Sequence, residues 1–408
     1  MKSLFRFFWT KKDVIHLDYA STTPVHSFVL RAMMPYFQNE WANPSALYKS
    51  GVRARTAIED ARTSVARLLR IRPQGVIFTS GGTESNNHAL VGLVEKLYRD
   101  GRAYADIEIV TTKIEHPSIL EMCDALARRG VVIQYVHVDH EGSIVLSHLE
   151  SLLSARTALI TFAYVNSEIG TVQEVKRITR AVRAYNTEHK TNILVHLDAC
   201  QAPLWLSCEM DMLGVDMMTL DSGKCYGPKG VGVLALRHGV IIDPFMQGGG
   251  QEGGLRSGTE NTALVVGCSV ALIRAQAMWK SRAGEVSLLQ DFMRDELLVR
   301  IPDAVQNGSR SARVANNVNI SIPGIDSEFA VITLDTHGIA ASTKSACGTS
   351  NSEGSHVVRT ISLDDARATS TIRFTFGETT TKNELIRAIE VLQKHVETVR
   401  LFKQTLPQ

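Results

Sequence analysis

The chain has 408 residues, an apolar fraction of 44% and a formal net charge of +2 at pH 7. This length allows two domains, each with a core of its own. The small net charge and the even spread of Lys and Arg along the chain argue against nucleic-acid binding as the main task, so we expect no direct nucleic-acid partner.

The 6 cysteines form no CxxC pair and no spacing typical of a zinc site, so we expect no metal site. In a chain of this size without a secretory signal, we interpret them as reduced thiols of a cytoplasmic protein. The N-terminal residues mix aromatic and basic side chains, and their apolar part is too short for a membrane span. We expect residues 1–14 to form a terminal arm that packs on the smaller domain.

Between about residues 15 and 265, apolar β-branched runs alternate with segments of helical period. The expected strands are residues 76–79, 107–111, 131–138, 158–165, 193–198, 217–220 and 232–236, with helices between several of them at residues 53–69, 84–98, 118–129 and 174–185. This alternation predicts a largely parallel sheet that is covered on both faces. Ligands of such sheets bind beyond the carboxyl ends of the strands.

A different pattern follows after residue 261. A long helical stretch to about residue 300 is expected to be kinked or broken. The following α+β unit is expected to contain strands at residues 318–321 and 371–376, a helix at 327–337 and a C-terminal helix from residue 382. The predicted fold is therefore α/β, with a large mostly parallel-sheet domain (residues 15–265) and a smaller α+β domain (residues 266–408).

Lys224 follows an apolar run and precedes a Gly-Pro-Lys-Gly turn. A lysine that is partly buried at a strand end can have a lowered pKa and attack a carbonyl as a neutral amine. The alternative is an ordinary solvated lysine in a turn, and Lys224 alone does not decide between the two.

Polar groups follow other strands at the same edge of the predicted sheet. Gly81 and Gly82 form a turn and Thr83 opens a helix, which is typical of a phosphate cradle. Asp198 ends a buried strand, where a carboxylate needs a partner such as a protonated pyridine nitrogen. His116 can stack on a flat ring and move protons. A helix cap, a salt bridge and a structural histidine are the alternatives, but the combination favours a site.

Two features of the remaining chain have reactive or binding character. Cys347 lies in a loop of small polar residues, Ser342–Ser350, which is the setting of an accessible, reactive thiol. The glycine-rich run Gln247–Asn261 permits close approach to a ligand or to a second subunit. Arg373 lies on an expected strand and suits a substrate carboxylate, although a surface ion pair is the alternative.

These motifs, in this order, resemble the cysteine desulfurases of the NifS/IscS type, in the class V aminotransferase branch of the fold-type I (aspartate aminotransferase-like) enzymes that use pyridoxal 5'-phosphate (PLP). The resemblance covers about residues 15–400. It includes LDYASTTP at Leu17–Pro24, NPSALY at Asn43–Tyr48, FTSGGTESNN, KIEHPS, VNSEIGTVQE, HLDACQ, GKCYGPKGVG, RSGTEN, SAC and IRFTFG.

The resemblance implies PLP as cofactor, L-cysteine as substrate and a homodimer. Lys224 would hold the cofactor covalently and move the α-proton of the substrate. Cys347 would attack the substrate's sulfur as a thiolate, which leaves alanine and a persulfide for a sulfur-acceptor protein in iron–sulfur cluster assembly or tRNA thiolation. The other implied contacts are His116 stacked on the ring, Asp198 on the ring nitrogen, Gln201 on the phenolic oxygen, Gly82 and Thr83 on the phosphate, Thr259 on the phosphate of the neighbouring subunit, and Asn43 with Arg373 on the substrate carboxylate.

The sequence departs from the family's pattern beside Lys224. Asp221 stands where the family usually has a phosphate-binding Ser, and Gly223 where it has His. Because a carboxylate repels a phosphate, we expect Ser222 to take over the phosphate contact and Asp221 to turn away or pair with a cation. Ser167 replaces a second Asn that contacts the cofactor or substrate, and its hydroxyl can still donate a hydrogen bond.

Three other functions remain open at this point. A selenocysteine lyase shares most of these motifs, whereas the loop around Cys347 argues against a plain aminotransferase. The changes at residues 167, 221 and 223 are the reason to consider a non-catalytic scaffold, and the presence of Lys224, Asp198 and His116 together argues against it.

Overall fold

The computed structural model describes residues 14–343 and 354–405. The predicted terminal arm and Cys347 therefore lie outside the described residues.

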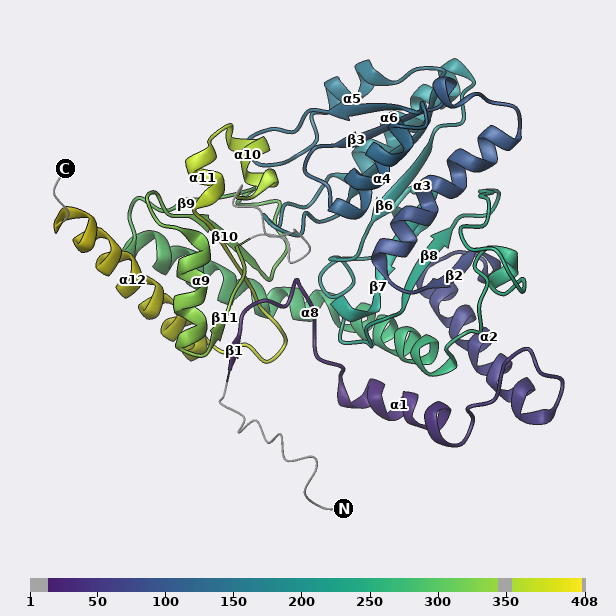
Figure 1. Cartoon of the computed structure of the whole chain (residues 1–408), viewed down its shortest axis with the longest axis horizontal. Coiled ribbons are helices and arrows are strands. Elements are labelled where there is room, and N and C mark those ends of the chain that lie inside the picture. The colour runs from purple at the N-terminus through teal and green to yellow at the C-terminus, as the bar shows by residue number, and fades with distance from the viewer. Residues whose placement is uncertain (1–13, 344–353, 406–408) are drawn as a thin grey trace.

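A sheet of seven strands forms the larger part of the molecule (Figure 1). Its strands are, in spatial order, β2 (Val76–Thr79), β8 (Gly232–Leu236), β7 (Met217–Asp221), β6 (Leu194–Asp198), β5 (Thr157–Ala163), β3 (Glu108–Thr112) and β4 (Val132–Val136). β8 runs in the direction opposite to the other six strands of this sheet. The predicted α/β fold with a mostly parallel sheet is confirmed.

Helices cover both faces of this sheet, and its side chains alternate between two cores because successive strand residues point to opposite faces. Ile109 and Met217 pack with α3 (Gly82–Arg99) and α4 (Pro117–Ala127). The next residues, Val110 and Met218, belong to a second cluster. That cluster includes residues of α1 (Ser27–Gln38), α2 (Lys49–Leu69), α6 (Val175–His189) and α8 (Thr262–Arg300). The shorter helices α5 (Leu146–Leu152) and α7 (Met210–Leu213) complete this part.

α8 is one continuous helix of 39 residues, so the expectation of a kink or break is wrong. It contains no proline, and it packs on α1 and α2 at one part of the molecule and on α12 (Lys382–Thr405) at the other. A helix supported along its length in this way has no reason to break. Of the helices that the structure describes, α8 alone is long and apolar enough to cross a membrane, but core helices pass the same test and half of its apolar window is buried.

The C-terminal unit is built on a small antiparallel sheet of β12 (Thr371–Thr375), β10 (Asn317–Ser321) and β9 (Val305–Gln306). Its helices are α9 (Ser327–Thr336), α10 (His356–Ser362), α11 (Asp365–Thr369) and α12. β1 (Ile15–His16) pairs in parallel with β11 (Ile339–Ala340). Residues 15 and 16, which were expected in the larger domain, therefore belong to the sheet structure of the C-terminal unit. The boundary near residue 265 stays a prediction.

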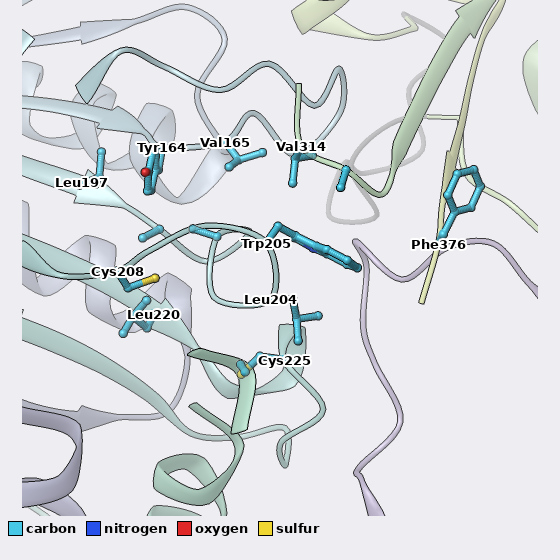
Figure 2. Close-up of a cluster of buried hydrophobic side chains, with 14 of the residues drawn as sticks. Tyr164, Val165, Leu197, Leu204, Trp205, Cys208, Leu220, Cys225, Val314 and Phe376 are labelled. Atoms are coloured by element: carbon cyan, nitrogen blue, oxygen red, sulfur yellow. The ribbon is translucent and has the colours of Figure 1, made fainter. Parts of the chain in front are cut away.

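The two parts share one apolar core, which fixes how their edges meet. Figure 2 shows Trp205, from the loop after β6, in the same cluster as Val314 and Phe376 of the C-terminal unit. All three side chains are buried. The segment after β1 also joins the two parts, because Thr375 donates a backbone hydrogen bond of 2.8 Å to Leu17 and Thr23 donates one of 2.9 Å to Gly223.

Candidate active site

A cavity of about 150 Å³ lies at the carboxyl ends of the parallel strands, between the sheet and the C-terminal unit. This is the edge where ligands of open α/β sheets bind. Eight of the residues predicted for the site line this cavity: Gly82, Thr83, His116, Ser167, Asp198, Gln201, Lys224 and Arg373.

Asp198 is held in one orientation at the end of β6. One carboxylate oxygen accepts a hydrogen bond of 2.7 Å from Asn86 on α3, and the other accepts one of 3.0 Å from the backbone of Cys200. The side chain of Asp198 is only 8% exposed. A buried carboxylate with preset geometry is suited to a cationic partner in the cavity.

Asn86 is a site residue that was not predicted from the motifs, although it lies in the SNN sequence one turn after Thr83. Besides Asp198, its amide donates a hydrogen bond of 2.9 Å to the hydroxyl of Ser118. The signal that points to Asn86 is the run of polar side chains in the first turns of a helix whose N-terminus faces a ligand site.

His116 caps the N-terminus of α4, and this cap sets the direction of its ring. Its Nδ1 accepts a hydrogen bond of 3.1 Å from the backbone of Ser118, so the neutral ring carries its proton on Nε2. Burial, opposed in part by Asp198, lowers the pKa of His116. The ring in the cavity is therefore neutral at pH 7.

Lys224 reaches the cavity from a short 3-10 turn, Ser222–Lys224, directly after β7. Its Nζ donates hydrogen bonds of 2.9 Å to the carbonyl of Ala20 and 2.5 Å to that of Ser21. The amine is half-buried and is held by the N-terminal segment, which argues against the alternative of a solvated lysine in a turn.

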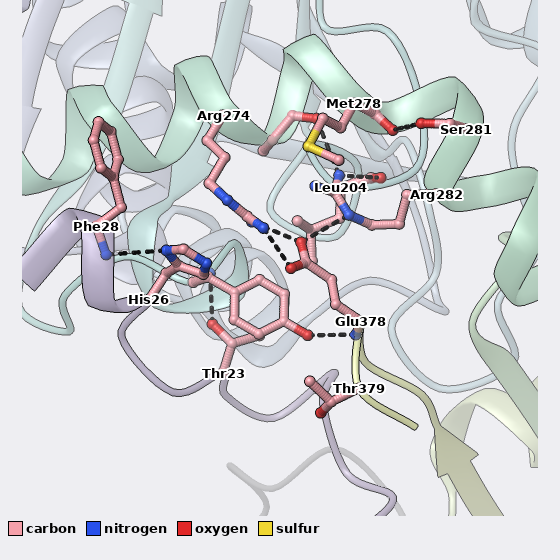
Figure 3. A network of polar contacts seen from close by, with 12 residues as sticks. Thr23, His26, Phe28, Leu204, Arg274, Met278, Ser281, Arg282, Glu378 and Thr379 are labelled. Atoms are coloured by element: carbon pink, nitrogen blue, oxygen red, sulfur yellow. Dashed lines mark hydrogen bonds and ion pairs between the residues drawn. The ribbon is translucent and has the colours of Figure 1, made fainter. Parts of the chain in front are cut away.

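The chain after Lys224 is anchored on α8. Tyr226, which adopts a positive φ of 64°, donates its backbone N–H to Thr23, and its hydroxyl accepts a hydrogen bond of 2.7 Å from the backbone of Glu378. Figure 3 shows Glu378 paired with Arg274 and Arg282 of α8. This partly buried network keeps the lysine turn in place.

Arg373 crosses from β12 into the cavity, and the structure contradicts the alternative of a surface ion pair, because the residue is 1% exposed. Its guanidinium donates 2.7 Å to Asp18, 2.9 Å to the Ser21 hydroxyl and 2.8 Å to the carbonyl of Ser167. Its Nε is buried without a partner among the described groups. The Nε–H of Arg373 therefore remains an oriented donor, on a positively charged side chain, that no described residue uses.

Asp221 is neither turned away nor paired with a cation among the described residues, which corrects that expectation. Its carboxylate lines the cavity and accepts hydrogen bonds of 3.1 Å from the backbone of Gly82 and 2.8 Å from that of Gly223. Ser222 is fully buried and does not line the cavity, so it does not take the place that the sequence predicted.

Two other predicted site residues lie outside the cavity. Thr259 is exposed in the loop before α8, and Asn43 is exposed in the loop after α1, where its side chain accepts a hydrogen bond of 2.9 Å from Ser45. Their predicted contacts with a second subunit and with the substrate stay predictions, as does the role of Cys347.

Two further titratable groups adjoin the site. Burial raises the pKa of Glu115 to about 8, and its Oε1 accepts a hydrogen bond of 2.6 Å from Thr112. Burial, helped by Asp198 and Asp221, raises the pKa of the Cys200 thiol in the cavity wall. Both groups are therefore neutral at pH 7, which limits the negative charge around the cavity.

Comparison with known proteins agrees with this geometry. The model of the family "Aminotransferase class-V" matches residues 15–387. The chain belongs to this family. Within the family it is 38% identical over 389 residues to the cysteine desulfurase IscS of Dictyoglomus turgidum, across 95% of this chain and 96% of that one. It is 35% identical to cysteine desulfurase IscS 1 of Archaeoglobus fulgidus, across 94% of this chain and 97% of that one.

Solved structures of the family have the same fold. A NifS-like protein superposes with a TM-score of 0.86 at 30% identity, over 94% of this chain and 100% of that chain. SspA in complex with cysteine superposes with a TM-score of 0.75 at 30% identity, over 89% of this chain and 98% of that chain. The class-V member described here is thus a fold-type I enzyme of the cysteine desulfurase group.

Proposed function

We propose that the protein is a PLP-dependent cysteine desulfurase, which converts L-cysteine to L-alanine and receives the sulfur on Cys347. The observation that carries the proposal is the convergence of Lys224, Asp198, His116 and Arg373 on one cavity. Membership of the class-V family and the identity to cysteine desulfurases over most of the chain support the choice of reaction.

The donor set fits the ring of PLP. Asp198 offers a buried, oriented carboxylate to a pyridinium nitrogen, and Lys224 offers an amine to the aldehyde carbon. His116 offers a flat neutral ring in the cavity wall, and Gln201 an amide. When bound, PLP supplies an electron sink that stabilises negative charge on the substrate's α-carbon. The phosphate end of the site fits less simply, because Asp221 lies there.

The chain's own groups then orient the substrate and move its protons. Arg373 supplies positive charge for the substrate carboxylate, and Asp18 with the carbonyl of Ser167 fixes the direction of the guanidinium. Lys224, once released from the carbonyls of Ala20 and Ser21, takes and returns the α-proton at Nζ. His116 is the histidine in the lining of the cavity, and its Nε2 carries a proton that can exchange there.

The backbone pairing of Ser342 with Arg373, five residues before Cys347, supports the proposed role of Cys347. Ser342 exchanges two backbone hydrogen bonds with Arg373, of 3.1 and 2.7 Å. Cys347 lies five residues further along the chain, a span of at most about 17 Å. Its thiolate attacks the sulfur of the substrate, the S–S bond forms, and the C–S bond breaks with its electron pair left on carbon. Protonation of that carbon gives the methyl group of alanine.

The partners and the compartment are part of the proposal. We propose L-cysteine as the substrate, a sulfur-acceptor protein, a homodimer and a cytoplasmic location. Large apolar side chains on α1 and the loop after it support a subunit contact, because exposed apolar patches mark protein interfaces. The exposed residues are Phe28, Phe37, Trp41, Leu47 and Tyr48.

One experiment tests the proposed reaction directly. The visible absorption of the purified protein is recorded, L-cysteine is added, and alanine and protein-bound sulfur are assayed together in equal amounts of wild type and Lys224→Ala. We expect equimolar alanine and sulfur from the wild type, and neither product nor cofactor absorption from Lys224→Ala. Bound cofactor without alanine would favour the scaffold. A strong preference for L-selenocysteine in the same assay would favour the lyase.

A further inference from the structure

The carboxylate of Asp221 occupies the N-terminus of α3, at the phosphate end of the cavity. Gly82 is the first residue of this helix, and its N–H donates to Oδ2 of Asp221 over 3.1 Å. The N-cap residue, Gly81, has a φ of 152° and offers no side chain to cap the helix. Asp221 therefore caps α3 from a neighbouring strand, and Gly223 holds the other carboxylate oxygen over 2.8 Å.

This position is the one that an incoming phosphate needs. Free N–H groups and the dipole at a helix N-terminus attract one anion, and here a fixed carboxylate already accepts the first N–H. Two anions at the same amide repel each other. A phosphate can therefore take this amide only if the Asp221 carboxylate gives it up.

Neighbouring groups do not relieve this conflict. The nearest arginine of the glycine-rich loop, Arg256, is paired with Glu84 on the same helix at 2.9 Å. The amine of Lys224 is held by two backbone carbonyls. The space around Gly82 is also narrow, because a methyl group at this residue would meet Sγ of Cys200 at 2.6 Å and Oδ2 of Asp221 at 3.4 Å.

We propose that Asp221 acts as an internal competitor for the cofactor's phosphate, and so sets how strongly this protein distinguishes PLP from pyridoxal, which lacks the phosphate. The inference rests on the proposed PLP-dependent function. Binding of PLP breaks the contacts of Asp221 with Gly82 and Gly223 and brings a second negative charge to this end of the cavity. Pyridoxal meets neither cost, so its binding is independent of residue 221.

The test compares cofactor binding in four forms of the full chain: wild type, Asp221→Ser, Asp221→Asn and Ser222→Ala. Each form is stripped of copurified cofactor by dialysis and titrated with PLP and with pyridoxal, with visible absorption and tryptophan fluorescence as readouts. Asp221→Ser frees the Gly82 N–H and removes the charge, whereas Asp221→Asn keeps the size and removes the charge alone. Ser222→Ala is the matched control, because that buried side chain does not line the cavity.

We expect Asp221→Ser to bind PLP at least about tenfold more tightly than the wild type. The free energy that corresponds to this change is small compared with the repulsion energy of two anions at contact distance. Asp221→Asn should change in the same direction, while the affinity for pyridoxal stays within about twofold in all four forms. Inorganic phosphate should raise the Tm of Asp221→Ser more than that of the wild type, because phosphate binds the freed amide.

Two results would overturn the inference in distinguishable ways. If the ratio of PLP to pyridoxal affinity is the same in all four forms, Asp221 does not compete with the phosphate and the inference fails, while the proposed function stands. If no form binds PLP, including Asp221→Ser, both fail. Circular dichroism shows whether each variant is folded, and Asp221→Asn answers the question on charge if Asp221→Ser does not fold.

Discussion

Asn86 on α3 donates a hydrogen bond of 2.7 Å to Asp198 at the end of β6, across 112 residues of sequence. The contact orients a buried carboxylate before any ligand arrives. The same amide reaches Ser118, whose hydroxyl lies 2.8 Å from Nδ1 of His116. Asn86 thus connects the two side chains that are proposed to face the cofactor ring and nitrogen.

Loss of the hydrogen bond from Asn86 is expected to weaken the interaction of the Asp198 carboxylate with the ring nitrogen of the cofactor. Asn86→Ala should lower kcat and PLP affinity, each by about tenfold, since a hydrogen bond to a charged group contributes roughly 1.5–3 kcal/mol. It should also shift the absorption maximum of the bound cofactor. The matched control is Asn87→Ala, because Asn87 bonds the backbone of Ser118 and not Asp198. Equal effects of the two variants would show that Asn86 acts through stability alone.

Cys347 and Cys200 are the two thiols to compare as sulfur acceptors. Cys347→Ala should abolish persulfide formation and leave the cofactor's visible absorption intact. Cys200→Ala should still form persulfide, because burial and the nearby Asp198 and Asp221 raise the pKa of Cys200 and keep it a thiol. Mass spectrometry after one turnover with L-cysteine locates the sulfur. Persulfide on Cys200, or unchanged sulfur release from Cys347→Ala, would contradict the assignment.

Glu115 gives the protein a defined dependence of stability on pH. Burial raises its pKa to about 8 in the folded state, compared with 4.5 for the ordinary carboxyl group. Between these values the folded protein holds a proton that the unfolded chain has lost, so the contribution of Glu115 to the unfolding free energy falls as pH rises. Relative to the wild type, Glu115→Gln should therefore become more stable between pH 5 and pH 8. Urea unfolding at both pH values measures this, and a difference that stays constant would refute the raised pKa.

The ion pair between Asp18 and Arg373 should stabilise the fold as well as orient the arginine. Asp18→Ala leaves a buried guanidinium without its carboxylate and should lower the unfolding free energy by about 3 kcal/mol. It should also raise KM for L-cysteine, because Arg373 is no longer held. The matched control, Asp303→Ala, breaks the exposed pair with Arg400 and should cost less than about 1 kcal/mol. Similar losses in the two variants would show that the Asp18 pair is solvated.

The sequence predicted the central sheet well because all of its strands except the edge strand β4 are buried on both faces. Every expected apolar run between residues 76 and 236 overlaps a strand. Strand direction was not predicted for β8, since an apolar run has no polarity. β1 and β11 have two residues each, which is too short for a periodic signal, and they pair across more than 300 positions.

The site was predicted at the level of motifs, and its hydrogen bonds were not. Motif order identified Lys224, Asp198, His116 and Arg373, all of which line the cavity. Asp221 was predicted to lie away from the phosphate because charge repulsion between the two groups favours that position. In the folded chain two backbone N–H groups compensate that charge, and the positions of such groups depend on tertiary geometry that no residue pattern shows.

The pairing of Asp18 with Arg373 has a consequence for how the protein is made. The two residues are 355 positions apart, and the backbone of Leu17 is bonded to Thr375 beside them. During synthesis Asp18 leaves the ribosome 355 residues before Arg373 does. The cavity wall is therefore finished only after Arg373 has emerged, so a chain that terminates between residues 224 and 373 carries the lysine turn without the arginine that faces it.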